Sequence, residues 1–171
     1  MQLQTERLII RPVQAEDWRS VQAIWQDFAR SPYAQYDMPH DTADVAVRSR
    51  IARWADCNGG TKHMFFAVCL QGRMIGYIAF NRRENGHEIG YCFHSDAHGK
   101  GYAKESHLAL FEYLRGIGIT RFLVRTAMEN APSIRLLASL GFHRTGTETV
   151  SFYKDENGAD LCFEGGIFER N

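Results

Sequence analysis

The segment of residues 88–103 joins a loop containing two glycines to the start of a helical pattern, and this combination can bind an anion. Gly99 and Gly101 permit backbone conformations and close approaches that a Cβ atom would forbid. The first turn of a helix has backbone N–H groups without intrahelical acceptors, and the helix dipole adds about half a positive charge there. Each hydrogen bond from such a group to a charged oxygen is worth roughly 1.5 to 3 kcal/mol. The segment therefore predicts a site in which several main-chain N–H groups hold a pyrophosphate.

Two common phosphate-binding motifs do not match this loop. A P-loop requires Gly-Lys followed by Ser or Thr, whereas Lys100 is followed by Gly101, so the magnesium-binding hydroxyl is missing from its place. A dinucleotide-binding fingerprint requires a different glycine spacing in an early βαβ unit, and this loop falls in the middle of the chain. A glycine turn without a ligand remains the alternative when the loop is considered alone.

The cysteines and histidines give no comparable signal for a metal site or a redox pair. The four cysteines form no CxxC pair and have no histidine at zinc-finger spacing, and the seven histidines show no metal-ligand spacing. We therefore expect no metal, and we expect free, mostly buried thiols. The cysteines are Cys57, Cys69, Cys92 and Cys162.

Helical and strand-like patterns surround the glycine loop. Apolar residues at a spacing of three and four predict helices at residues 16–28, about 42–57, about 103–114 and 132–140. Apolar runs between turn signals predict strands at residues 8–12, 64–70, 74–80, 88–93, 122–127, 147–153 and 161–168. Some of these strands are linked by hairpins and others by helices. The order predicts an α/β (α+β) fold with a mixed, mostly antiparallel central sheet of about seven strands flanked by about four helices.

An irregular segment, residues 31–41, separates the first two predicted helices. It contains two prolines together with Tyr33, Tyr36 and Met38, and is too aromatic for a solvated linker. We interpret it as a substrate-side loop.

Size and composition limit the remaining classes of protein. The 171 residues are 44% hydrophobic, which fits a single domain over residues 1–171 with a filled core. Twenty Lys and Arg balance twenty Asp and Glu, so we expect no nucleic-acid partner and no membrane partner. The N-terminus lacks the apolar stretch of a secretion signal, and no segment is apolar enough to cross a bilayer. We therefore expect a cytoplasmic protein.

A second motif lies one helix and one strand beyond the loop. Residues 130–142 read Asn-Ala-Pro-Ser-Ile-Arg-Leu-Leu-Ala-Ser-Leu-Gly-Phe. Together with His98-Gly99-Lys100-Gly101-Tyr102-Ala103, this segment resembles the paired motifs of the GNAT acyltransferase superfamily. Residues 5–12, Thr-Glu-Arg-Leu-Ile-Ile-Arg-Pro, look like the start of its RimJ/RimL-like branch, which acetylates the amino termini of ribosomal proteins, among other amines. The resemblance extends over residues 5–153.

The chain departs from the family pattern at two places. His98 stands where the family usually has Arg or Gln, and His94-Ser95 stands where the branch often has Asp-Pro. These changes affect the contribution of side chains to phosphate binding. The main-chain N–H groups of the loop are unaffected.

The resemblance implies that acetyl-CoA is the co-substrate. Its pyrophosphate would lie on the main-chain N–H groups of residues 99–104, and its pantetheine arm beside a strand that ends at Phe93 and is splayed from its neighbour. The implied binding residues are Cys92, Phe93, His94, His98, Gly99, Lys100, Gly101, Tyr102, Ala103, Lys104, Asn130 and Ser133.

The resemblance also implies direct attack of a neutral amine on the thioester. Glu88 is the first candidate for a base acting through a water molecule, and Glu148 is the second. Ser133 matches a family position near the CoA sulfur and is the candidate acid for the leaving thiolate; its alternative role, like that of Asn130, is to serve the helix end. A covalent intermediate on Cys92 is the less favoured alternative, because the sequence shows no base to activate the thiol.

Two functions from different classes remain open. One is an N-acetyltransferase acting on a protein amino terminus or a small amine. The other is a catalytically weak acyl-CoA-binding sensor or interaction domain, which acceptor-dependent thiol release would exclude. The sequence does not identify the acceptor, and it leaves a homodimer open.

Overall fold

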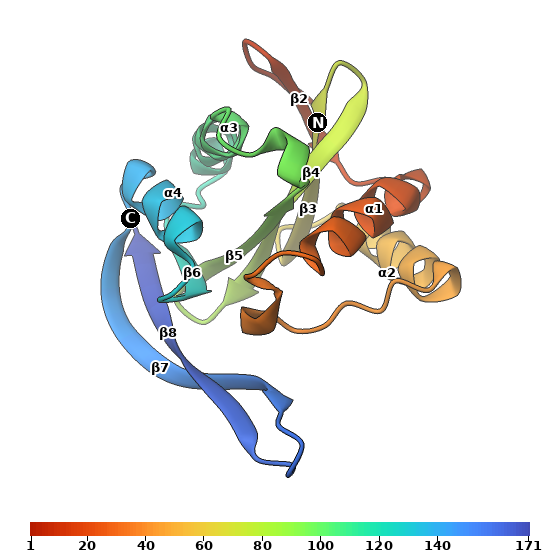
Figure 1. Ribbon diagram of the computed structural model, residues 1–171. Helices are drawn as coiled ribbons and strands as arrows, with labels where there is room; N and C mark the ends of the chain where they lie inside the picture. The colour runs from red at the N-terminus through yellow and green to blue at the C-terminus, as the bar shows by residue number, and fades with distance from the viewer.

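The chain forms one mixed sheet with helices on both faces (Figure 1). The computed structural model describes residues 1–171. The strand order is β1-β2-β3-β4-β5-β6-β8-β7, and only the pair β5 and β6 is parallel. The strands are β1 (Leu3–Gln4), β2 (Leu8–Pro12), β3 (His63–Leu70), β4 (Arg73–Arg83), β5 (Gly86–Phe93), β6 (Phe122–Ala127), β7 (His143–Lys154) and β8 (Asp160–Arg170). The helices are α1 (Trp18–Phe28), α2 (Asp44–Cys57), α3 (Tyr102–Gly116) and α4 (Ala131–Ser139).

The predicted mixed, mostly antiparallel sheet and its four helices are confirmed, with two differences in detail. The sheet has eight strands because the two-residue edge strand β1, too short to show a period, also pairs with β2. Helix α2 begins at Asp44, two residues later than the predicted start at about residue 42. In the turn before the helix, the side chain of Asp41 accepts the N–H of Ala43. No helix has the length and apolar character required to span a membrane.

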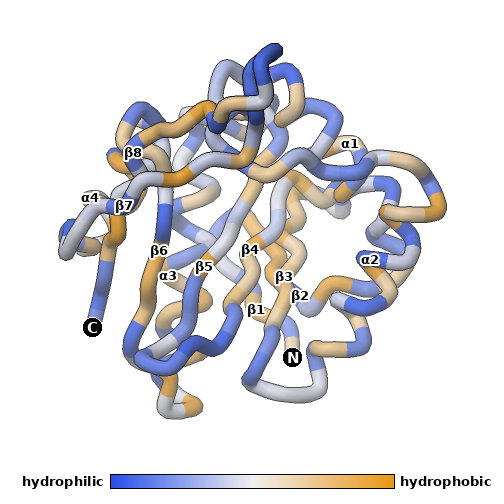
Figure 2. The backbone as a smooth tube through the Cα atoms, turned by 90° about the horizontal axis from the view of Figure 1, so that it is seen from below, coloured by the Kyte–Doolittle hydropathy of each residue, from blue (hydrophilic) through white to orange (hydrophobic).

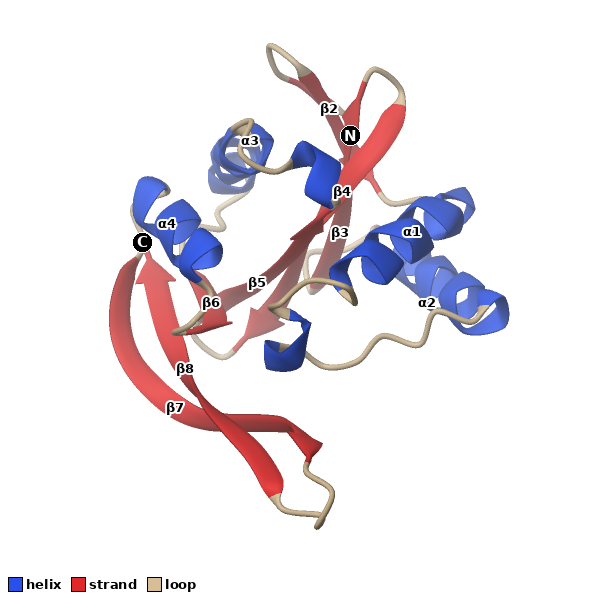
Figure 3. Cartoon of the chain, viewed as in Figure 1, coloured by secondary structure: helices blue, strands red, loops and turns tan.

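Alternating side chains of the central strands divide the core into two layers. On β3, Met64, Phe66 and Val68 pack with the buried residues of α3 and α4, whereas Phe65 and Ala67 pack with those of α1 and α2. This alternation follows from the two-residue period of a strand. Figure 3 shows the two helix pairs on opposite faces, and Figure 2 shows hydrophobic residues gathered along β3 and β4.

The parallel pair β5 and β6 is held together only at one end. Two residue pairs are in register, His87 with Phe122 and Glu88 with Leu123. Beyond them, β5 continues to pair with β4 and β6 with β8, but not with each other. The predicted splay is therefore confirmed, and it leaves main-chain polar groups of β5 without a ladder partner on that side.

Candidate functional site

The loop that follows β5 presents a row of unpaired backbone N–H groups at the start of α3. Gly99 and Gly101 have φ angles of +72° and +81°, which other residues rarely adopt. None of the main-chain N–H groups of residues 99–104 donates a hydrogen bond within the chain. A Cβ atom at Gly99 would meet no atom within 4 Å, so the loop is open there. We call residues 99–104 the amide cradle; it combines free donors with the positive end of the α3 dipole.

Side chains near the cradle bind the loop itself. The His98 Nε2 lies 2.9 Å from the Phe93 carbonyl oxygen, and the Lys100 ammonium donates to the Asp96 carbonyl at 2.7 Å. The His98 N–H donates to Ser95. The side chain of His98 therefore links the loop to the end of β5 through its hydrogen bond with the Phe93 carbonyl. Lys100 contributes its main-chain N–H to the cradle while its side chain spans the preceding turn.

His94 is oriented by carboxylates at the end of α1 and in the short turn after β5. Its Nε2 lies 4.0 Å from Asp27, and its Nδ1 lies 3.5 Å from Asp96. Its N–H donates to the Ile75 carbonyl at 2.9 Å. The structure thus places the side chain and the N–H of His94 in internal contacts.

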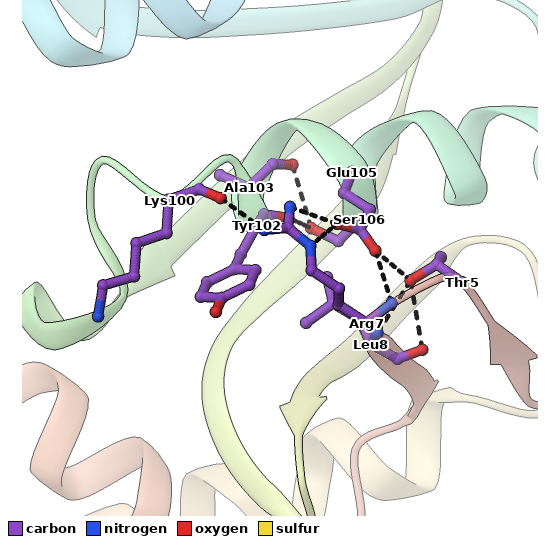
Figure 4. Close-up of polar contacts among 8 residues, drawn as sticks. All are labelled: Thr5, Arg7, Leu8, Lys100, Tyr102, Ala103, Glu105 and Ser106. Carbon is purple, nitrogen blue, oxygen red and sulfur yellow. Dashed lines mark hydrogen bonds and ion pairs between the residues drawn. The ribbon is translucent and has the colours of Figure 1, made fainter.

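Arg7, in the connection between β1 and β2, contacts the amide cradle and the first turn of α3 (Figure 4). Its Nη1 donates to the Lys100 carbonyl at 3.0 Å, and its Nε donates to Glu105 at 2.8 Å. Burial alone would raise the pKa of Glu105, but hydrogen bonds from Thr5 and Arg7 hold that pKa below its usual value. Sequence reasoning gave Arg7 no role, because no local pattern reports contacts across almost a hundred residues.

A pair of hydroxyl groups links β5 to α4. The Tyr91 hydroxyl oxygen lies 2.6 Å from Ser133 Oγ, and Ser133 is 8% exposed. Asn130 caps α4 by accepting the Ser133 N–H at 3.2 Å, so the cap is Asn130 and the Ser133 hydroxyl is not used for capping. Burial raises the pKa of Tyr91 to about 12. Sequence reasoning missed Tyr91, although its place two residues before Phe93 puts it on the same strand face.

The thiol of Cys92 belongs to the other face of β5. It packs against the layer of α1 and α2, and burial raises its pKa to about 12. A thiol with such a pKa stays protonated at neutral pH and is a poor nucleophile. This property favours direct transfer over a covalent intermediate on Cys92.

The two candidate bases, Glu88 and Glu148, meet at one arginine. Arg125 on β6 contacts Glu88 at 2.9 Å and Glu148 at 3.1 Å, and Arg83 contacts the second oxygen of Glu88 at 2.6 Å. Glu88 lies in the paired end of β5, roughly 16 Å along the strand from Phe93. The structure thus brings the two glutamates together, but separates them along the strand from the cradle. Action as a base would require one ion pair to open.

The predicted substrate-side loop packs between α1 and the β7–β8 hairpin. The centroids of the Tyr36 and Phe163 rings lie 5.3 Å apart, and the Tyr153 hydroxyl donates to the Ala34 carbonyl oxygen at 3.4 Å. His40 stacks on Trp25 with a ring separation of 4.4 Å. A cavity of about 130 Å³ lies here, lined by Trp25, Phe28, Ala29, Ala34, Met38, Pro39, His40 and Tyr153.

Comparisons with known proteins agree with the two sequence motifs. The family model for the acetyltransferase (GNAT) domain matches residues 7–143. YnaD of Bacillus subtilis (strain 168), an uncharacterized N-acetyltransferase, is 30% identical over 151 residues, which cover 85% of each chain. The structure of a GNAT-family acetyltransferase from Bacillus anthracis matches with a TM-score of 0.75 and 26% identity, over 99% of this chain and 97% of that one. RimL, a ribosomal L7/L12 alpha-N-protein acetyltransferase solved with coenzyme A, shares the fold with a TM-score of 0.83 at 18% identity, covering 99% and 97% of the two chains.

Proposed function

The chain belongs to the GNAT acetyltransferase family, and from that premise we propose that it transfers an acetyl group from acetyl-CoA directly to a primary amine. The acceptor is a protein N-terminal α-amine or the amine of a small molecule. The observation that carries the proposal is the amide cradle. The cradle follows the end of β5, and the edge of β5 toward β6 is unpaired there. The reaction is proposed to take place in the cytoplasm, without a nucleic-acid or membrane partner.

The donor would be held mainly by the backbone. The diphosphate would accept hydrogen bonds from the cradle, each worth roughly 1.5 to 3 kcal/mol for a charged acceptor. The pantetheine amides would pair with the open side of β5 between Gly90 and Phe93. Because this side lacks a ladder partner, the donor would satisfy main-chain groups without displacing a strand.

Transfer forms a bond between the amine nitrogen and the acetyl carbon and breaks the bond between that carbon and sulfur. The amine gives up a proton, and the leaving thiolate takes one. Ser133 is proposed to donate to the thiolate, with Tyr91 hydrogen-bonded behind it. Glu88 or Glu148 would accept the amine proton through water. An α-amine with a pKa of about 7.7 to 8.0 is neutral about one time in seven at pH 7, so a modest base suffices.

The acceptor is proposed to enter beside the substrate-side loop. The cavity of about 130 Å³ is lined mainly by apolar and aromatic residues, with His40 and Tyr153 as the residues that carry polar groups. Such a lining suits the body of a small amine or the first side chain of a peptide. RimL acts on the α-amine of L7/L12, which favours a peptide amino terminus in the acceptor panel.

The proposal is tested by incubating the purified chain with acetyl-CoA and a panel of amines. The panel contains peptides with free amino termini, the same peptides blocked at the amino terminus but retaining a lysine, and small amines. We expect acceptor-dependent release of CoA and, by mass spectrometry, one added acetyl group on the acceptor. CoA binding without release across the panel would support the binding-sensor alternative, and absence of CoA binding would overturn the proposal.

A further inference from the structure

Arg7 fixes the direction of one peptide unit in the cradle. Its Nη1 holds the Lys100 carbonyl at 3.0 Å. All peptide bonds of the chain are trans, so the N–H of Gly101 points away from the carbonyl with which it shares a plane. By holding the carbonyl, Arg7 therefore turns the Gly101 N–H toward the free side of the loop.

The same guanidinium packs against the next two residues. It lies over the Tyr102 ring, 4.6 Å from the centroid, and its Nη2 lies 3.4 Å from the position that a Cβ atom at Gly101 would occupy. Arg7 thus contacts Lys100 and Tyr102 and lies beside Gly101, at the point where the loop becomes α3. Figure 4 shows the Arg7 side chain among Lys100, Tyr102 and Glu105.

Arg7 also neutralises a carboxylate beside the cradle. Glu105 lies in the first turn of α3, where its negative charge would repel a bound diphosphate. The Arg7 guanidinium contacts the Glu105 Oε2 at 2.6 and 2.8 Å, while the Arg7 N–H and the Thr5 hydroxyl donate to Oε1. Both carboxylate oxygens are therefore held by the N-terminal segment.

We expect the Arg7 contacts to contribute more to binding of the donor than to the stability of the fold. The Arg7 side chain is 41% exposed and that of Glu105 is 18% exposed, so solvent screens part of the attraction between them and limits what the ion pair adds to folding. A residue placed only for stability would not need to hold a carbonyl of a loop whose N–H groups are unpaired.

We propose that Arg7 is a positioning residue for the acyl donor: it orients the amide cradle and cancels the charge of Glu105, so that the cradle accepts a diphosphate. This inference rests on the proposed use of acetyl-CoA. Arg7 acts through the loop backbone, and its effect is confined to donors that carry a diphosphate.

The first experiment compares CoA affinities by isothermal titration calorimetry. We expect Arg7→Ala to weaken CoA binding at least about tenfold, equivalent to about 1.4 kcal/mol. Arg7→Lys keeps the charge without the forked donors and should recover part of the loss. The matched control is Arg73→Ala, since Arg73 is also exposed and pairs with Asp96 in the same loop region at 3.7 Å. An equal loss in the Arg73 variant would reduce the effect to general charge and overturn the proposal.

The second experiment uses a donor without a diphosphate, S-acetylpantetheine. Arg7→Ala should lower kcat/KM for acetyl-CoA through KM, with little change in kcat, and should leave kcat/KM for S-acetylpantetheine within about twofold. An equal loss with both donors would show a purely structural role. Thermal denaturation accompanies both assays; if Arg7→Ala does not fold, Arg7→Lys carries the same comparison of donors.

A double variant tests the part played by Glu105. In Arg7→Ala/Glu105→Gln the uncompensated carboxylate is gone, so we expect part of the CoA affinity to return relative to Arg7→Ala. No recovery would refute charge cancellation. Failure of the wild-type chain to bind CoA contradicts the proposed donor, whereas wild-type binding that Arg7→Ala leaves intact contradicts only the role of Arg7.

Discussion

Tyr91 and Ser133 hold their hydroxyl oxygens 2.6 Å apart on two elements that the proposed donor must lie beside. Because burial raises the pKa of Tyr91 to about 12, that hydroxyl keeps its proton at neutral pH and can donate to Ser133. Ser133 is then free to donate its own proton elsewhere. Hydrogen bonds in such a chain strengthen one another in a low-dielectric setting. The pair is therefore suited to protonate a thiolate.

Replacing the hydroxyl of Ser133 tests this assignment. We expect Ser133→Ala to lower kcat by about a hundredfold, the lower limit usual for loss of a general acid, with KM for acetyl-CoA changed by less than about threefold. Tyr91→Phe removes only the supporting donor, and we expect a smaller loss of about tenfold. Steady-state kinetics between pH 6 and 9 provide the measurement.

The control on the same helix is Ser139→Ala, whose hydroxyl binds the Leu136 carbonyl at 2.8 Å on the exposed side. Its kinetics should match those of the unmodified chain. A rate for Ser133→Ala that equals the wild-type rate at every pH would eliminate the acid role.

At the scale of elements, the proposed donor site is formed by β5, which separates from β6, and by α3, which begins directly after Gly101. The splay of β5 from β6 opens one main-chain edge, and Gly101 leaves the first turn of α3 without a side-chain cap. A Ser or Asp at this position would place a side-chain acceptor at the N–H groups. Glycine leaves those groups free.

The need for glycine at position 101 can be separated from backbone strain. Gly101 and Gly118 have φ angles of +81° and +83°, so an alanine at either position should lower the free energy of unfolding by about 1 to 2 kcal/mol. The Cβ atom at position 101 would lie within the amide cradle, in van der Waals contact with Arg7 Nη2 at 3.4 Å, whereas position 118 has open space and lies outside the cradle. We expect Gly101→Ala to weaken CoA binding by about threefold or more and Gly118→Ala to leave it unchanged.

Urea denaturation and calorimetric titration of both variants supply the two quantities. If both variants bind CoA as tightly as the wild-type chain, the cradle does not depend on the geometry at Gly101.

The elements that could be predicted from the sequence are those whose signal is local. Seven strands, four helices and the two-glycine loop each follow from periodicity, apolar runs or glycine within a few residues. Strand β1 has two residues and no period, and the start of α2 depends on how Asp41 folds back onto Ala43. Arg7 and Arg125 gained their roles from partners on distant elements, which no local pattern reports.

At the scale of the whole molecule, one buried histidine couples stability to pH. His107 on α3 is 1% exposed, and its ring packs edge-on to Tyr91 at 4.9 Å. Its Nδ1 lies 2.6 Å from the Ala103 carbonyl oxygen and must carry a proton to donate, while its Nε2 has no partner. A second proton would put an unpaired charge in the core. Burial accordingly lowers the pKa of His107 to about 4.

This lowered pKa predicts a loss of stability in weak acid. The unfolded chain binds a proton at His107 with a pKa near 6.5, so between about pH 6.5 and 4 the unfolded state takes up more protons than the folded state. The contribution of His107 to the free energy of unfolding is complete above that pH range. It falls as the pH falls, and at pH 5 the free energy of unfolding has decreased by about 2 kcal/mol. The pKa values of Asp27 and Glu105 are held below their usual range, because hydrogen bonds outweigh the opposing effect of burial; loss of their contributions therefore begins mainly below pH 5. Urea denaturation at pH 7 and pH 5 should show a smaller decrease for His107→Leu than for the wild-type chain, and equal decreases in the two proteins would refute the role of His107.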